Sequence, residues 1–114
     1  MPSPARTAAP PPAAALERAR VLRILRAHEA EIRARGVTRL RLFGSMARGE
    51  AGPASDVDLL ADIDDRATFS LIELVDLQYF LADLLGRRVE VGTSLEEARP
   101  RVRARIEADA VEVF

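Results

Sequence analysis

A glycine–serine pair and two carboxylates lie at opposite ends of one loop, between two apolar segments of the chain. The first segment ends at Gly44 and Ser45, ten residues follow, and Asp56 and Asp58 open the second segment. Side chains two positions apart on a strand project to the same face, so this spacing places two negative charges together. They repel each other unless a cation lies between them, and carboxylate oxygens are ligands that Mg²⁺ prefers.

Gly44 and Ser45 offer what such a metal site lacks, a place for an anionic substrate. Glycine lets anionic groups approach the backbone closely, and the serine adds a hydroxyl donor where a short helix could begin. The combination predicts a nucleotide site. The plainer interpretation is surface acids and turn chemistry, with Ser55 and Asp56 in a turn.

Three features favour the metal site over the plainer interpretation. Two charges at the start of an apolar strand are costly unless they are compensated. The glycine–serine turn stands at the end of a strand, where ligand sites of open sheets commonly lie. A third carboxylate, Glu90, stands between Val89 and Val91, and it would face the same cleft if its strand is a neighbour.

Composition limits the class of protein. A chain of 114 residues suits one domain, and its net charge of −1 gives no global attraction to nucleic acid or membrane. It contains no cysteine, no apolar run long enough to span a bilayer, and no N-terminal pattern of a secretory signal. We therefore expect a soluble cytoplasmic domain.

The chain divides into a tail and one domain. Residues 1–15 are rich in proline and alanine, which predicts a disordered tail, and residues 16–114 form the domain. Periodicity predicts helices at 16–35, 70–85 and from 100 onward, with one helical turn after Ser45 and another at 94–98. It predicts strands at 37–43, 57–63, 88–92 and an edge strand at 111–114. The result is an α/β (α+β) fold, a small mixed sheet with helices packed mainly on one face.

A family resemblance rests on the central stretch, which reads FGSMARGEAGPASDVDLL. It resembles the signature of the minimal nucleotidyltransferases of the DNA polymerase beta-like superfamily, in which Gly-Ser is followed after ten residues by Asp-x-Asp. Arg48 and Gly49 match the usual start of that signature. The segment from about residue 20 to 114 resembles the family throughout, including its leucine-rich helix, short strand and last helix.

The resemblance implies roles for individual residues. Asp56 and Asp58 would bind one or two Mg²⁺ ions that bridge the triphosphate of ATP, and Glu90 would be the third carboxylate, which activates the attacking hydroxyl. The family usually has aspartate at the position of Glu90. The phosphate-binding residues would be Gly44 and Ser45, with Arg48 and, less favoured, Arg41 as further contacts.

The resemblance also implies a partner. Related enzymes carry a second domain that binds the acceptor, whereas nearly every residue here after 15 is used in the core. Proteins of this size resemble the antitoxin half of HEPN–MNT toxin–antitoxin pairs, in which the small enzyme adenylylates a tyrosine of the HEPN RNase toxin. Two alternatives remain: a binding module that neutralises the toxin by contact, and transfer to a small molecule or an RNA end. A homo- or hetero-oligomer is compatible with each of them.

Overall fold

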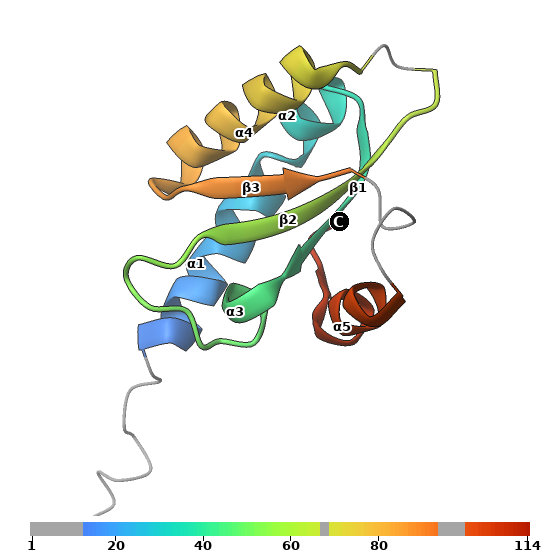
Figure 1. Ribbon diagram of the computed structural model, residues 1–114. Helices are drawn as coiled ribbons and strands as arrows, with labels where there is room; N and C mark the ends of the chain where they lie inside the picture. The colour runs from blue at the N-terminus through green and yellow to red at the C-terminus, as the bar shows by residue number, and fades with distance from the viewer. Residues whose placement is uncertain (1–12, 67–68, 94–99) are drawn as a thin grey trace, which may run out of the picture.

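The computed structural model describes residues 13–66, 69–93 and 100–114. Its centre is a four-stranded mixed sheet in the order β3-β2-β1-β4 (Figure 1). Strand β1 pairs in antiparallel fashion with β2 and with β4, whereas β2 and β3 are parallel. The strands are Val37–Phe43, Val57–Ile63, Val89–Gly92 and Val111–Glu112 for β1 to β4. The predicted mixed sheet is confirmed, with β4 at its edge.

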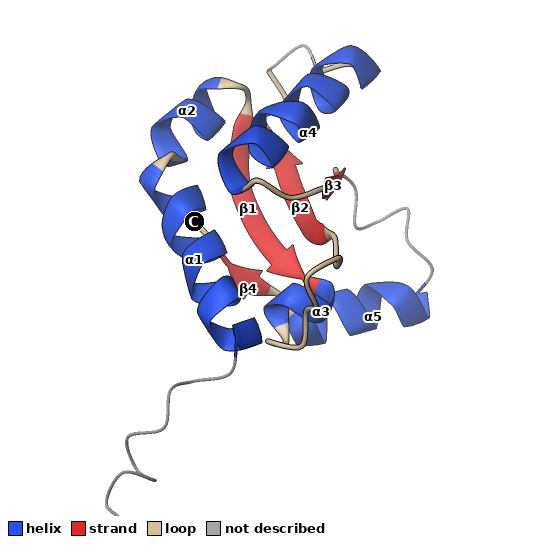
Figure 2. Ribbon diagram, turned by 90° about the vertical axis from the view of Figure 1, so that its left-hand side faces the viewer, coloured by secondary structure: helices blue, strands red, loops and turns tan. Residues whose placement is uncertain are grey.

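Helices α1, α2 and α4 pack on one side of the sheet, while α5 lies apart from them beside α3 (Figures 1 and 2). The helices are Ala13–Ala27, Glu29–Ala34, Gly44–Ala47, Leu71–Leu85 and Pro100–Asp109 for α1 to α5. None of the helices in the described ranges is long and apolar enough to cross a membrane. The helical turn expected at 94–98 and the tail at residues 1–12 lie outside the described residues.

Alternation along the strands gives the sheet a buried face and an open face. The buried face meets the three helices in one core, to which the strands contribute Leu40, Leu42, Val57, Leu59, Ala61, Val89 and Val91. The helices contribute Val21, Leu25, Ile32, Leu77, Leu81 and Leu85. Every second strand residue points to the opposite, open face, which carries Arg39, Arg41, Asp58, Asp62 and Glu90.

The first helical segment differs from the expectation in two ways. It begins at Ala13 rather than Leu16, because alanines 13–15 are strong helix formers and extend the helix backward. It also divides at His28, whose backbone leaves the helical region at φ −105° and ψ 20°. The His28 ring nitrogen Nδ1 lies 3.0 Å from a Glu31 carboxylate oxygen on the surface.

Helix α4 has the predicted ends, and one side of it is exposed. Ser70 caps it, the Glu73 carboxylate accepts a hydrogen bond from the Ser70 N–H at 2.8 Å, and Gly86 ends it in the left-handed region. The helix contacts the short edge strand β3, and four of its large apolar side chains remain exposed: Leu71, Ile72, Val75 and Tyr79.

Candidate active site

Neighbouring strands bring the predicted acidic residues together on the open face of the sheet. In the parallel pairing of β2 and β3, Asp58 is directly opposite Glu90. In the antiparallel pairing of β1 and β2, Asp58 is opposite Phe43, the residue before Gly44. The condition under which Glu90 would face the same cleft, that its strand neighbours the strand of Asp58, is therefore met.

Gly44 lies directly against the Asp58 carboxylate. A Cβ atom added at Gly44 would be 2.6 Å from Oδ2 of Asp58, closer than real side chains approach. Gly44 also has φ +73°, a left-handed conformation that favours glycine. This position therefore needs glycine for two reasons, its backbone conformation and the space that Asp58 occupies.

The surroundings of Asp58 disfavour its ionised form. Burial raises the pKa of Asp58, as do the negative charges of Glu90 and Asp56 and a hydrogen bond with the Glu90 carboxyl. Asp56 turns partly outward, and its Oδ1 lies 3.9 Å from Nε of the exposed Arg88. In the part of the chain that the structure describes, no group of three or more acidic, His or Cys side chains is placed so that it could hold a metal ion. The carboxyls of Asp58 and Glu90 are instead hydrogen-bonded to each other.

The donor set fits a hard divalent cation. All three side chains offer only oxygen atoms, which suit Mg²⁺ and give no advantage to softer metals. The repulsion that raises the pKa of Asp58 is the interaction that a cation between the carboxylates would reverse. For Asp56, Asp58 and Glu90 to hold such an ion together, their side chains would have to move from the positions that the structure gives them.

Ser45 and Arg48, the predicted phosphate contacts after Gly44, differ in their surroundings. Ser45 follows Gly44 in the first turn of α3 and is half-buried. Arg48 is directed away from that turn: its guanidinium donates to Glu50 at 3.0 Å and to Asp109 of α5 at 2.8 Å. Its role as a phosphate contact stays a prediction, and it would require these two ion pairs to open.

Arg41 is mostly covered on the open face. Its Nη2 lies 3.3 Å from Oδ1 of Asp62, and 14% of its side chain is exposed. Its Nε is buried and has no hydrogen-bond partner among the described residues. The structure therefore gives Arg41 a pairing with Asp62 on the sheet and no contact with the Gly44 turn.

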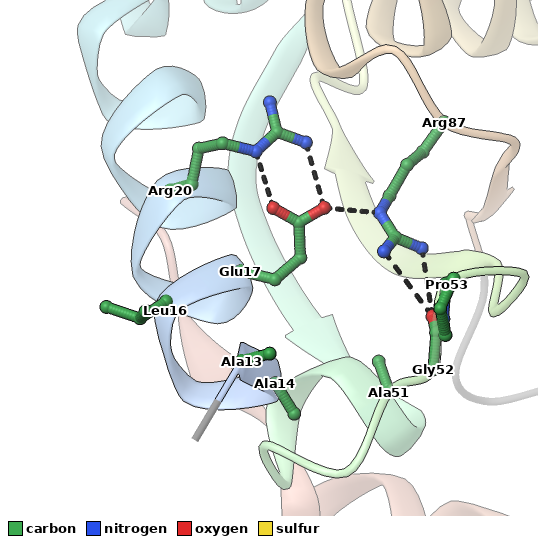
Figure 3. Close-up of a pocket in the computed structure, with 9 residues that line it drawn as sticks. All are labelled: Ala13, Ala14, Leu16, Glu17, Arg20, Ala51, Gly52, Pro53 and Arg87. Atoms are coloured by element: carbon green, nitrogen blue, oxygen red, sulfur yellow. Dashed lines mark hydrogen bonds and ion pairs between the residues drawn. The ribbon is translucent and has the colours of Figure 1, made fainter. Parts of the chain in front are cut away.

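Sequence reasoning missed one group of residues beside the site. Arg87 donates to backbone carbonyls of the loop that leads to Asp56 and also to the Glu17 carboxylate on α1. Glu17 is in turn bonded by Arg20 (Figure 3). No local pattern reveals this network, because Glu17 and Arg87 are 70 positions apart in the chain. Only the packing of α1 against the end of α4 brings them together.

The Glu17 carboxylate should contribute to stability in a pH-dependent way. Hydrogen bonds from Arg20 and Arg87 lower the pKa of Glu17 to about 2. A carboxyl with a lowered folded-state pKa stabilises the fold above its unfolded pKa, and that stabilisation disappears as the pH falls toward 2. We expect Glu17→Gln to lower the free energy of unfolding by about 1–3 kcal/mol at pH 7. Urea unfolding at several pH values should show the difference from wild type shrinking below pH 4.5; a difference that is independent of pH would contradict the assignment.

Comparison with known proteins shows the family of this chain. The nucleotidyltransferase domain family matches residues 23–113. Protein adenylyltransferase MntA of Thermococcus cleftensis is 45% identical over 69 residues, which cover 60% of this chain and 68% of that protein.

Two solved structures share the fold. One, described as a provisional minimal nucleotidyltransferase, has a TM-score of 0.62 and 34% identity, covering 79% of this chain and 93% of that one. The other is a tri-AMPylated Shewanella oneidensis HEPN toxin in complex with an MNT antitoxin, with a TM-score of 0.54 and 17% identity. It covers 89% of this chain and 71% of the matched chain, and at this identity it supports the fold alone. The chain belongs to the nucleotidyltransferase domain family, with the minimal, DNA polymerase beta-like fold.

Proposed function

We propose that this nucleotidyltransferase transfers AMP from ATP to a tyrosine hydroxyl of a HEPN-type RNase toxin and so acts as its antitoxin. The observation that carries the proposal is the contact of Gly44 with Asp58, with Glu90 directly opposite on the next strand. This arrangement joins a backbone turn open to phosphate with a cluster of carboxylates suited to Mg²⁺.

The residues divide the work between binding and proton transfer. Asp56 and Asp58 would hold one or two Mg²⁺ ions, which neutralise charge on the triphosphate when bound. Gly44 and Ser45 would hold the β- and γ-phosphates through backbone N–H groups and the serine hydroxyl. Glu90, which is exposed, would take the proton of the acceptor hydroxyl.

The reaction is a displacement at the α-phosphorus of ATP. A bond forms between the acceptor oxygen and that phosphorus, the bond to the β-phosphate oxygen breaks, and pyrophosphate leaves. Catalysis of this kind depends on positioning the reactants in line. Glu90 is one methylene longer than the aspartate usual in the family, and its carboxyl is hydrogen-bonded to that of Asp58.

The proposed partner rests on the relatives of this chain. A relative at 45% identity carries the name protein adenylyltransferase. That name favours a protein acceptor over a free small molecule.

Labelled ATP can test the proposal directly. We expect a HEPN-type protein encoded next to this chain to become labelled from [α-³²P]ATP in the presence of Mg²⁺, and to remain unlabelled from [γ-³²P]ATP. This difference separates nucleotidyl transfer from phosphoryl transfer. Mass spectrometry should place the added AMP on tyrosine, and Tyr→Phe in the acceptor should abolish it.

Three other results would overturn parts of the proposal. An unlabelled partner whose RNase activity is still blocked by stoichiometric binding would indicate a binding module. Label that enters RNA or a small molecule instead of protein would show that the proposed acceptor is wrong. Transfer of label from the γ-phosphate would show that the reaction is phosphoryl transfer and not nucleotidyl transfer.

A further inference from the structure

We propose that Arg87 is a positioning residue for the metal site, because it fixes the loop that carries Asp56. The inference rests on the proposed function of Asp56 as a metal ligand. Arg87 itself does not touch the three carboxylates; its side chain is 13% exposed and lies under the loop.

Arg87 holds the loop by its backbone. Its Nη1 donates to the carbonyl oxygen of Ser55 at 2.8 Å and to that of Gly52 at 3.3 Å, and its Nη2 lies 3.4 Å from the Gly52 oxygen. Every residue has a backbone carbonyl oxygen, so these bonds fix the path of the loop independently of its side chains. Ser55 is the residue immediately before Asp56.

The segment that Arg87 holds is itself a closed turn. The Ser55 N–H donates to the Gly52 carbonyl at 3.1 Å, and the Gly52 N–H donates to the Ser55 hydroxyl at 2.9 Å. On the other side of Asp56, the Val57 N–H donates to the carbonyl oxygen of Arg88 at 2.9 Å. Asp56 is therefore held from both sides by residues of the turn between α4 and β3.

Arg87 is also bonded to helix α1. Its Nε lies 2.6 Å from a Glu17 carboxylate oxygen, and Arg20 holds the same carboxylate while its Nη2 donates to the Leu85 carbonyl at 2.8 Å. Figure 3 shows the contacts of Glu17 with Arg20 and Arg87, and those of Arg87 with Gly52. These residues line a pocket of about 440 Å³ between α1 and the loop. Because the pocket separates the loop from α1 there, polar contacts through Arg87 set the distance between them.

The contacts require the shape of arginine and not merely its charge. Arg87 uses three nitrogen atoms in two directions, toward α1 with Nε and toward the loop with both Nη atoms. A lysine ammonium is one point at the end of a flexible stem and cannot bridge both sides in the same way. Arg87→Lys therefore keeps the charge and removes the bridge.

Arg20 provides a matched control in the same network. It shares the Glu17 carboxylate with Arg87 but has no hydrogen bond to the loop. We expect Arg20→Lys to lower the free energy of unfolding about as much as Arg87→Lys does, and to leave the loop that carries Asp56 in place. The comparison separates positioning of Asp56 from general stability.

Two measurements on the full chain test the inference. Calorimetry with Mg²⁺ and a non-hydrolysable ATP analogue should show that Arg87→Lys weakens Mg²⁺-dependent binding about 10-fold to 100-fold, the usual effect of losing a residue that orients a metal ligand. Amide hydrogen exchange, without any ligand, should become faster at residues 52–57. In Arg20→Lys both quantities should stay within about 3-fold of wild type, below that 10-fold lower limit.

The outcomes separate this inference from the proposed function. Loop exchange in Arg87→Lys equal to that of wild type, or equal losses in both variants, would overturn the positioning role. A wild type that binds Mg²⁺ and the analogue but labels no protein would overturn the proposed acceptor and leave Arg87 in its role. If Arg87→Lys does not fold, Glu17→Gln is the second variant: it weakens the α1 anchor alone, and unchanged loop exchange there would also count against the inference.

Discussion

Replacing Asp58 with asparagine should abolish nucleotidyl transfer and leave the protein at least as stable as wild type. An amide is a much weaker ligand for Mg²⁺ than a carboxylate, and charge neutralisation by a metal contributes several kcal/mol to such a transition state. A loss of about 4 kcal/mol corresponds to a rate reduction of about 10³-fold. Single-turnover labelling of the acceptor measures this loss.

The stability of Asp58→Asn follows from the pKa of the wild-type residue. Burial and the charges of Glu90 and Asp56 raise the pKa of Asp58, so its ionised form is less favourable in the folded protein than in the unfolded chain. This destabilisation is present above the folded-state pKa and is relieved as the pH falls below the unfolded-state value. Asparagine carries no charge at any pH, so the variant lacks this destabilisation. Urea unfolding at pH 7 should give an unchanged or higher free energy of unfolding.

Asp62→Asn is the matched control for this experiment. Asp62 lies on the same strand and the same face as Asp58, but it pairs with Arg41 at 3.3 Å. Its replacement should change stability slightly, because the ion pair is partly exposed, and should preserve transfer. Transfer by Asp58→Asn as fast as by Asp62→Asn would show that Asp58 is not the metal ligand. A lower free energy of unfolding for Asp58→Asn would contradict the stability expectation.

Gly44→Ala should reduce both stability and transfer. The left-handed backbone at φ +73° costs a non-glycine residue about 1–2 kcal/mol. The new methyl group would also meet the Asp58 carboxylate at 2.6 Å and displace it. A displacement of about 1 Å at a reacting centre can lower the rate about 10²-fold. Thermal unfolding and labelling of the acceptor measure the two effects.

Gly49→Ala separates backbone strain from displacement of Asp58. Gly49 has nearly the same conformation, φ +72°, but an added Cβ would meet no atom within 4 Å. It should therefore lose a similar amount of stability and retain most of the transfer rate. Equal loss of transfer in the two alanine variants would mean that backbone strain alone accounts for the effect at Gly44.

The sheet and the positions of the candidate carboxylates on it were largely predictable, because the sequence patterns that indicate them are local. Alternation placed β1 and β2 at the observed residues, and a two-residue spacing put Asp56 and Asp58 at the start of β2. Glu90 was identified by its contrast with the valines beside it. Its position opposite Asp58 depends on the parallel pairing of β2 with β3, which the sequence left open.

Long-range contacts between charged side chains could not be predicted in this way. With seventeen arginines in the chain, a motif alone does not identify the partner of each one. Arg48 matched a phosphate-binding pattern, yet its guanidinium pairs with Glu50 and Asp109. Periodicity likewise shows that α4 is apolar on several sides, but it cannot distinguish a side covered by the sheet from the exposed side at Ile72 and Tyr79.

Under the role proposed for Glu90, the parallel pairing of β2 with β3 also determines when a newly made chain could become active. The pairing of β1 and β2 joins segments close in sequence, so it can form early, with Gly44 and Asp58 in place. Glu90 arrives only after α4 has crossed back over the sheet, and closing such a distant contact is slow. A chain still on the ribosome would thus carry the phosphate turn and two carboxylates without the third. Consumption of ATP would begin only after Glu90 has emerged and β3 has joined the sheet.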